Sequence, residues 1–408
     1  MLFIPRVLTT FNVDLHISNS KLPSNTQYLR LETVGRRSQK PHSVLVRFIL
    51  NRGKVVVFPQ NTGRQDWVEN IKQNPSVRLY GESSTLEGTA LLKQISGLDD
   101  PLLGSFTRKY GMAEVKKRYW GQSRYVEVDV SSRSRAEDYE ELYYSDLEAA
   151  FDGVAEHYDE HILGNPMNVW LRNRSVHHLS KIFNPGDTVL EIGCGTGTET
   201  LLLAQHGLRI IATDISAKML GVLTRKAKDA GLDEAIVPLH ARTYTLRDKL
   251  RQLGYANLDG AYSTYGAINT EPKLGPLFRD LHAMIKPGGH LVLGVWNKYC
   301  LYEMIGYSLR LKPSMAIARL RNPVPVGLSR FCINSYAYSV GSIKKHLTNL
   351  FKLERVFGVE ILLPASNLTR YLPPEPLLDM VKKADLALEP LFPWNRLGDH
   401  FLGAYVRV

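Results

Sequence analysis

The sequence predicts two domains: a small β-barrel, and after it an α/β domain in which helices cover both faces of a mostly parallel sheet. The length of 408 residues exceeds the usual size of a single domain. Up to about residue 130, short strand patterns separated by turn residues are typical of a small barrel. From about residue 148, helical patterns alternate with short apolar strands, which is typical of a parallel sheet.

The first predicted domain covers residues 1–133. Helices are expected at WVENIKQNP (67–75) and around residues 100–120. The strand patterns, which alternate or are rich in β-branched residues, are TQYLRLETVG (26–35), HSVLVRFILN (42–51), KVVVFPQ (54–60), SVRLYGE (76–82), LEGTALLKQI (86–95) and SRYVEVDVSS (123–132).

Positive charge gathers in this first domain. Residues 1–133 contain 20 Lys and Arg against 11 Asp and Glu, whereas the whole chain contains 51 against 40. A solvated basic face, an anionic ligand, nucleic acid and an acidic membrane surface all fit such an excess.

A polar, charged stretch, SSRSRAEDYEELYYSD (131–146), has no clear strand pattern, so we expect a linker at 134–147. The second domain then covers residues 148–408, with an apolar, partly basic insertion at 298–345 that we interpret as a helical lid. Its alternating strands and helices are TVLEIG (188–193), TETLLLAQHG (198–207), LRIIATDIS (208–216), AKMLGVLTRKAKDAGL (217–232), LDGAYSTYG (258–266), KLGPLFRDLHAMIKPGG (273–289) and HLVLGVWN (290–297).

Composition favours a cytoplasmic protein. Hydrophobic residues make up 44% of the chain, but no apolar run approaches the roughly 18 residues of a membrane span. The start, MLFIPRVLTTFNVDLH, lacks the pattern of a signal peptide. Cys194, Cys300 and Cys332 are far apart and odd in number, which argues against a disulfide framework or a metal cluster. We therefore predict no metal site.

A glycine-rich turn, EIGCGTGTE (191–199), lies between an apolar strand and a helix. A Walker loop needs Lys-Ser or Lys-Thr after its last glycine, which Thr198-Glu199 excludes. The dinucleotide fingerprint G-x-G-x-x-G is one residue longer than this spacing. A purely structural turn and an S-adenosylmethionine site remain, and three glycines between a strand and a helix favour S-adenosylmethionine, because they let the backbone pass close to a ligand without pyrophosphate. Asp214, at the end of the next strand, is positioned for the ribose hydroxyls.

With these motifs, residues 148–408 resemble the class I S-adenosylmethionine-dependent methyltransferases, including those of quinone biosynthesis. VLEIGCGTG matches the first motif of that family, FDGVAEHYD (151–159) its helix over the cofactor, and KPGGHLVL (286–293) the turn before its fifth strand. The resemblance implies a Rossmann-like fold and a cofactor site made of Tyr158, Arg172, Glu191, Gly193, Gly195, Gly197, Asp214, Ile215 and Met219.

The same resemblance implies a role for each of these residues. Glu191 approaches the methionine amine, Ile215 and Met219 flank the adenine, and Tyr158 covers the cofactor. Arg172 pairs with the cofactor carboxylate or is a helix-surface arginine. One departure is that His240, Ala241 and Arg242 stand where the family commonly has an acid for the adenine amino group.

The methyl acceptor is predicted to be a small, apolar molecule bound beside the strand tip AYSTYGAINTE (261–271). Tyr262, Tyr265 and Asn269 on that tip, and His400 on the last strand, are candidate catalytic residues. A purely structural role is the alternative for each. The insertion 298–345 caps this pocket and is compatible with peripheral membrane contact or with an ordinary capping subdomain.

The first domain resembles the deazaflavin-dependent nitroreductases, which are split β-barrels, over residues 26–130. Thr33, Gly35, Arg36, Arg37, Ser38 and Pro41 follow one family motif, and Trp67, Asn70 and Asn74-Pro75 follow another. The resemblance implies that 8-hydroxy-5-deazaflavin coenzyme or FMN is held by Arg36, Arg37, Ser38, Gln60, Asn61 and Thr62. Gln39 and His42 depart from the motif, and the alternative is a barrel kept for homodimerisation.

Three functions therefore remain open. The first is a bifunctional enzyme, a methyltransferase joined to an oxidoreductase barrel. The second keeps the methyltransferase and makes the barrel a dimerisation module. The third is an RNA-binding methyltransferase with a basic arm at residues 1–133, which we do not favour because aromatic-basic motifs are scarce there.

Overall fold

The computed structural model describes residues 28–408, except 61–64, 82–83, 98, 120, 136, 322–323 and 325–332. The chain divides into two compact units, one made mainly of residues up to Tyr143 and the other mainly of Tyr144 to Val408. The segment 134–147, expected as a linker, contributes the end of strand β6 and much of helix α4 (Glu137–Asp152). Cys332, Asn61 and Thr62 lie outside the described residues.

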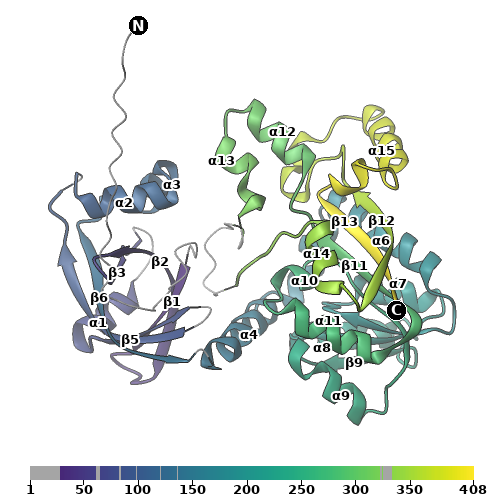
Figure 1. Cartoon of the computed structure of the whole chain (residues 1–408), viewed down its shortest axis with the longest axis horizontal. Coiled ribbons are helices and arrows are strands. Elements are labelled where there is room, and N and C mark those ends of the chain that lie inside the picture. The colour runs from purple at the N-terminus through teal and green to yellow at the C-terminus, as the bar shows by residue number, and fades with distance from the viewer. Residues whose placement is uncertain are drawn as a thin grey trace, which may run out of the picture. The chain divides into compact units, whose positions relative to one another are not determined.

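The first unit is a closed antiparallel barrel with the strand order β1-β2-β3-β6-β5-β4 (Figure 1). Strand β4 pairs with β1 and closes the ring. The predicted barrel is therefore confirmed. Its strands are β1 (Tyr28–Val34), β2 (Pro41–Asn51), β3 (Lys54–Val57), β4 (Ser76–Gly81), β5 (Ser84–Gln94) and β6 (Arg124–Arg135).

Alternation along the strands fills the barrel. In β1, Leu29 and Leu31 are fully buried while their neighbours are half-buried, as expected where successive side chains point to opposite faces. Helix α1 (Asp66–Gln73) packs Trp67 and Ile71 against this core. Two further helices, α2 (Pro101–Tyr110) and α3 (Met112–Arg118), pack on a second cluster that includes Phe58 and Phe106.

The second unit contains a seven-stranded sheet in the order β12-β13-β11-β10-β7-β8-β9. Neighbouring strands from β11 to β9 are parallel, whereas β13 is antiparallel to both of its neighbours. This mostly parallel sheet confirms the predicted fold class. The strands are β7 (Thr188–Ile192), β8 (Arg209–Asp214), β9 (Ile236–His240), β10 (Leu258–Ser263), β11 (Ile285–Trp296), β12 (Phe351–Val359) and β13 (His400–Arg407).

Helices cover both faces of this sheet, each over its own apolar core. One core joins the sheet to α6 (Pro166–Ile182), α7 (Thr198–Gln205) and α8 (Ala217–Asp229). The other joins it to α9 (Leu246–Gln252), α11 (Leu274–Met284) and α14 (Val340–Leu347). The remaining α-helices described in this unit are α5 (Tyr158–Leu163), α10 (Ala267–Thr270), α12 (Leu301–Leu309), α13 (Pro313–Ala316) and α15 (Leu377–Leu388).

The strand order reverses between β7 and β10. From β7 the chain continues outward to β8 and β9, whereas from β10 it continues in the opposite direction to β11. Such a reversal opens a crevice at the carboxyl ends of the two strands, where ligands of α/β proteins bind. The glycine turn after β7 and the tip of β10 both lie at this edge.

The insertion 298–345 contributes α12, α13 and α14 where it is described. Ile343 and Leu347 of α14 belong to the core beside the sheet, so this last part is not a lid. Among the residues described, no helix combines the length and the apolar character needed to cross a membrane.

Candidate functional site

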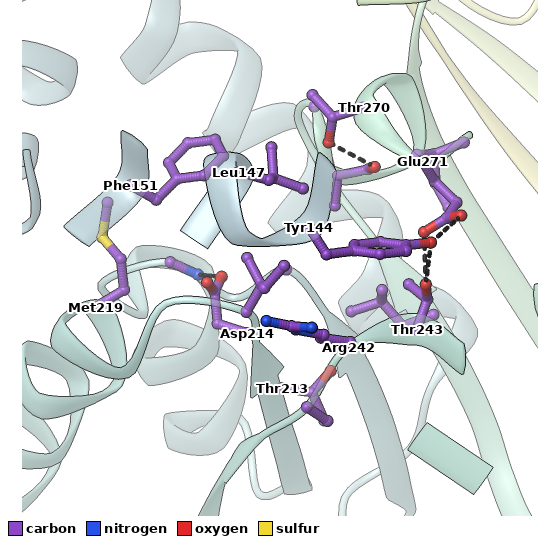
Figure 2. A pocket seen from close by; sticks show the side chains of 18 of the residues that line it. Tyr144, Leu147, Phe151, Thr213, Asp214, Met219, Arg242, Thr243, Thr270 and Glu271 are labelled. Carbon is purple, nitrogen blue, oxygen red and sulfur yellow. Dashed lines mark hydrogen bonds between the residues drawn. The ribbon is translucent and has the colours of Figure 1, made fainter. Parts of the chain in front are cut away.

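A cavity opens at the reversal point, between the glycine turn, the end of β8 and the start of α10 (Figure 2). It encloses about 910 Å³ of empty space, part of it open to solvent. We call it the donor cavity. Of the nine predicted cofactor residues, six line it: Tyr158, Gly193, Gly195, Asp214, Ile215 and Met219.

The glycine turn is shaped by left-handed backbone conformations. Gly193, Gly195 and Gly197 have φ of 74°, 55° and 81°, a backbone conformation that residues with a Cβ rarely adopt. A Cβ at Gly193 would lie 2.4 Å from the Cβ of Ala267. Gly193 and Gly195 form part of the cavity wall, whereas Gly197 is the N-cap of α7 and lies against Leu223, outside the lining.

Asp214 ends β8 with its carboxylate fixed by the backbone. The N–H of Gly195 donates to Oδ2 and the N–H of Ser216 donates to Oδ1, each at 2.8 Å. Burial raises the pKa of Asp214, and the backbone N–H groups oppose that rise. The acid is therefore held at the cavity wall with lone pairs remaining for two hydroxyls.

Glu191 lies beneath the turn rather than in the lining. It is 1% exposed, and the hydroxyl of Thr200 donates to its Oε2 at 2.6 Å. Burial raises the pKa of Glu191 to about 8. This residue supplies a buried acid under the glycine turn.

Helix α4 forms an apolar wall, although most of its residues lie in the predicted linker at 134–147. Tyr144, Leu147 and Phe151 line the donor cavity, and Figure 2 shows them over Asp214 and Met219. Their spacing of three and four residues places them on one face of the helix. That periodicity was the available signal, and the surrounding acidic residues obscured it.

Polar groups close the far end of the donor cavity. The hydroxyl of Tyr144 donates to Glu271 at 2.8 Å, and the hydroxyl of Thr243 donates to the same carboxylate at 2.6 Å (Figure 2). Arg242, which also lines the cavity, lies 3.3 Å from Glu148 of α4. The family motif has an acid after β9, and this chain lacks it. Two acids that the motif does not contain, Glu148 and Glu271, lie at this end of the cavity instead.

A second cavity adjoins the first and shares Tyr158, Tyr265, Gly266 and Thr270 with it. It has about 670 Å³ of empty space, part of it open to solvent, and we call it the acceptor cavity. Its other lining residues are Ile162, Asn168, Leu171, Arg172, Asn269, Trp296, Ser335 and His400.

Arg172 lies in the acceptor cavity and is nearly buried. It forms a short ion pair with Glu199 on α7, and its guanidinium lies 5.5 Å from the centre of the Tyr265 ring. Glu199 is 2% exposed, so the pair is shielded from water. Arg172 is therefore not an exposed helix-surface arginine.

The catalytic candidates occupy different environments. The hydroxyl of Tyr265 contacts Ser175 and the carbonyl of Leu171, and burial raises its pKa. Tyr262 is fully buried in the sheet and lines neither cavity. His400 lines the acceptor cavity, with its ring 5.6 Å from that of Tyr265.

Asn269 lines the acceptor cavity, but its amide is already used by the backbone. Nδ2 donates to the carbonyls of Trp296 and Tyr336, at 3.2 and 2.6 Å, and Oδ1 accepts from the N–H of Trp296 at 2.9 Å. These bonds join α10 to β11 and to the segment before α14, so they favour a structural role.

The barrel carries its own cavity, with about 940 Å³ of empty space partly open to solvent, and Arg36, Arg37 and Ser38 line it. Arg36 pairs with Asp66 at 3.0 Å, and the Ser38 hydroxyl lies 2.7 Å from Nε2 of His42. Gln60 is half-buried after β3 and is not part of this lining.

Comparison with known proteins agrees with both halves of the molecule. Residues 189–289 match the methyltransferase domain family, and residues 18–102 match the F420H(2)-dependent quinone reductase family. The chain is 31% identical over 111 residues to the S-adenosyl-L-methionine-dependent Diels-Alderase iccD of Talaromyces variabilis. These aligned residues make up 26% of this chain and 36% of that protein.

Two further relatives are methyltransferases by name. A demethylmenaquinone methyltransferase of Beutenbergia cavernae is 28% identical over 37% of this chain and 58% of its own length. A ubiquinone biosynthesis O-methyltransferase of Azoarcus sp. is 26% identical over 45% of this chain and 79% of its own length. Both resemblances drawn from the sequence are confirmed: the chain carries an S-adenosylmethionine-dependent methyltransferase domain, preceded by a domain of the F420H(2)-dependent quinone reductase family.

Proposed function

We propose that the Tyr144–Val408 unit transfers a methyl group from S-adenosylmethionine to a small, apolar acceptor. The observation that carries this proposal is the pair of adjoining cavities at the strand reversal. They share Tyr158 and Tyr265, so a donor in one and an acceptor in the other would meet between these two rings. The names of the relatives support methyl transfer as the class of reaction but do not indicate the acceptor.

The residues of the donor cavity fit this cofactor. Asp214 offers fixed carboxylate lone pairs for ribose hydroxyls, and Met219 with Phe151 offers an apolar wall for an adenine ring. Glu191 beneath the turn places an acid near a cationic amine. Arg172 lines the adjoining acceptor cavity, and its guanidinium N–H groups beyond those facing Glu199 suit the carboxylate of a cofactor that reaches the boundary of the two cavities.

S-adenosylmethionine supplies an electrophilic methyl group when it is bound, so the protein's task is mainly alignment. Holding two reactants in place can contribute up to about 7–11 kcal/mol. The rings of Tyr158 and Tyr265 line both cavities and present π faces that attract a cation. Ile162, Leu171 and Trp296 give the acceptor cavity the apolar wall that excludes water around the acceptor.

The test is calorimetric titration of the full chain with S-adenosylmethionine. Asp214→Ala and Glu191→Ala are each expected to lower its affinity by roughly 10- to 150-fold, since a charge-assisted hydrogen bond contributes ~1.5–3 kcal/mol. Asp233→Ala, an exposed acid after α8, is the control and should bind normally. Unchanged affinity in the Asp214 and Glu191 variants would refute this pocket.

For the barrel, we propose that the cavity beside Arg36 and Arg37 binds the phosphate-bearing tail of a deazaflavin coenzyme. Planar guanidinium groups suit phosphate, and Arg37 is exposed at the cavity. Spectroscopic titration with this coenzyme, and separately with FMN, tests it. Arg37→Ala should weaken binding, while Arg52→Ala, an exposed arginine in the β2–β3 turn, should not. No binding of either coenzyme would leave the barrel as a scaffold or a dimerisation module.

We further propose that α12 and α13 contact an anionic membrane surface from which the acceptor is taken. Ile305, Leu309 and Leu311 are 51%, 79% and 89% exposed. The only acid between residues 298 and 321 is Glu303, which is buried against Arg319. Leu309→Ser with Leu311→Ser should reduce co-sedimentation with phosphatidylglycerol vesicles, and Leu253→Ser, exposed after α9, should not. Equal co-sedimentation of all three proteins would refute this contact.

A further inference from the structure

Three potential metal ligands meet behind the wall of the acceptor cavity. Glu360 follows β12, Asp399 precedes β13 and His400 begins it, and one ligand atom from each lies within 4.8 Å of the others. Nδ1 of His400 is 2.8 Å from Oδ2 of Asp399. Glu360 and Asp399 are 0% and 2% exposed, so water does not solvate these acids.

Glu360 is the unexplained member of this cluster. Both of its carboxylate oxygens are buried without a hydrogen-bond donor, while Nδ1 of His400 faces Oδ2 of Asp399. The backbone holds Glu360 in place, since its carbonyl accepts from the N–H of Asp399 at 3.0 Å. An unpartnered buried carboxylate is costly, so its retention calls for a compensating group.

Protein cations do not supply that compensation among the residues described. Arg319 is the buried cation beside the cluster, and it is shared between Asp399 and Glu303. Asp385 adds a further acid nearby, satisfied by the N–H groups of Ile361 and Leu362. The buried carboxylates around Glu360 therefore outnumber the one arginine beside them.

We propose that Glu360, Asp399 and His400 bind a divalent metal ion through two carboxylate oxygens and Nδ1 of the imidazole. A set of one nitrogen and two oxygens suits Zn²⁺ or Mn²⁺ better than Mg²⁺, which prefers oxygen alone. Arg319, bound to the other oxygen of Asp399, is then an outer partner that orients this ligand. The site does not depend on methyl transfer.

Metal at Nδ1 would also fix the chemistry that His400 presents to the acceptor. A neutral imidazole that binds metal through one nitrogen carries its proton on the other. His400 would therefore offer an Nε2–H donor at the cavity wall, which suits an acceptor bearing a carbonyl or ether oxygen. This last step rests on the proposed function, whereas metal binding itself does not.

The experiment is titration of the chelator-treated full chain with Zn²⁺ and with Mn²⁺, without S-adenosylmethionine, checked by elemental analysis after gel filtration. One equivalent of metal should bind. Glu360→Gln and His400→Gln should each weaken binding by roughly 100-fold or more, since even loss of an outer partner costs ~10–100-fold. Glu354→Gln, an exposed acid on β12, is the matched control.

Two results would overturn the proposal. One is the absence of stoichiometric binding by the wild-type chain. The other is equal binding by Glu360→Gln, with thermal unfolding showing that the variant is folded. Either result would mean that Glu360 is compensated by a proton held between it and Asp399. The titration of S-adenosylmethionine against Asp214→Ala is independent of both, so failure of the methyltransferase proposal is recognised separately.

Discussion

The donor and acceptor cavities are held by different kinds of contact. One wall of the donor cavity is shaped by backbone: Gly193 and Gly195 have positive φ, and the Asp214 carboxylate is fixed by main-chain N–H groups. The acceptor cavity is shaped by side chains from distant segments, such as Arg172 on α6 and His400 on β13. A short stretch of chain can therefore specify this wall of the donor cavity, whereas only the tertiary structure specifies the acceptor cavity.

The strongest way to break this contrast is to add one methyl group to the glycine turn. Gly193→Ala would place a Cβ 2.4 Å from that of Ala267 in a left-handed conformation. We expect a loss of ~1–3 kcal/mol in the free energy of unfolding and more than about 100-fold in affinity for S-adenosylmethionine. Urea denaturation and calorimetry measure these two effects.

The matched control is Gly221→Ala on α8. A Cβ at Gly221 meets no atom within 4 Å, and its φ is not positive. Alanine stabilises a helix interior relative to glycine, so this variant should gain up to ~1 kcal/mol and keep its affinity. Equal losses in the two variants would show that the turn has no special requirement for glycine.

For the acceptor cavity, the corresponding test breaks a buried side-chain pair. Arg172→Met would leave Glu199 buried without its cation, and we expect the free energy of unfolding to fall by about 3 kcal/mol. Adding Glu199→Gln should recover part of this loss, which a double-mutant cycle in urea measures. Arg225→Met removes an exposed partner of Glu156 and should cost less than ~1 kcal/mol. Similar losses in both single arginine variants would contradict shielding of the Arg172 pair.

The contrast also explains what could be predicted from sequence. The glycine turn, Asp214, Ile215 and Met219 lie in one stretch; the turn spacing favours a cofactor site, the family resemblance adds Ile215 and Met219, and all of these residues except Gly197 line the donor cavity. The first part of helix α4 was missed because Tyr144 and Leu147 are embedded in acidic residues that suggested a linker, whereas Phe151 lies in the segment predicted to cover the cofactor. Local pattern could not show that a polar helix covers a cavity.

Contacts between residues far apart in the chain could not be predicted from the sequence, for a different reason. Asn269 is a polar residue at a strand tip, where catalytic residues are often found. Its amide is already hydrogen-bonded to main-chain groups of Trp296 and Tyr336. Nothing local to His400 indicated that Glu360 would lie beside it. The side-chain partners of an acceptor site depend on how distant strands and helices pack, which residue spacing does not encode.

A pH experiment sharpens the account of the donor cavity. Burial raises the pKa of Glu191 to about 8, above its ordinary value near 4.5. Between these values the folded state holds a proton that the unfolded state has released, so the free energy of unfolding falls as pH rises through this window. We expect a decrease of at most ~1.4 kcal/mol per pH unit relative to Glu191→Gln. Parallel stability curves for the two proteins would show that Glu191 is ionised in the folded state.

The smallest effect is expected for Tyr265→Phe, at the point where the two cavities meet. Its hydroxyl contacts Ser175 and the carbonyl of Leu171, while its ring lies near Arg172 and His400. Tyr265→Phe keeps the ring, so activity should fall by less than about threefold, since a net hydrogen bond contributes ~0.5–1.5 kcal/mol and this one does not face the acceptor. Tyr265→Ala removes the shared wall and should cost ~10²-fold through lost alignment. A large loss of activity in Tyr265→Phe would instead indicate that the hydroxyl is a catalytic group. Methyl transfer would then depend on the proton of this hydroxyl rather than on the shape of the cavity walls.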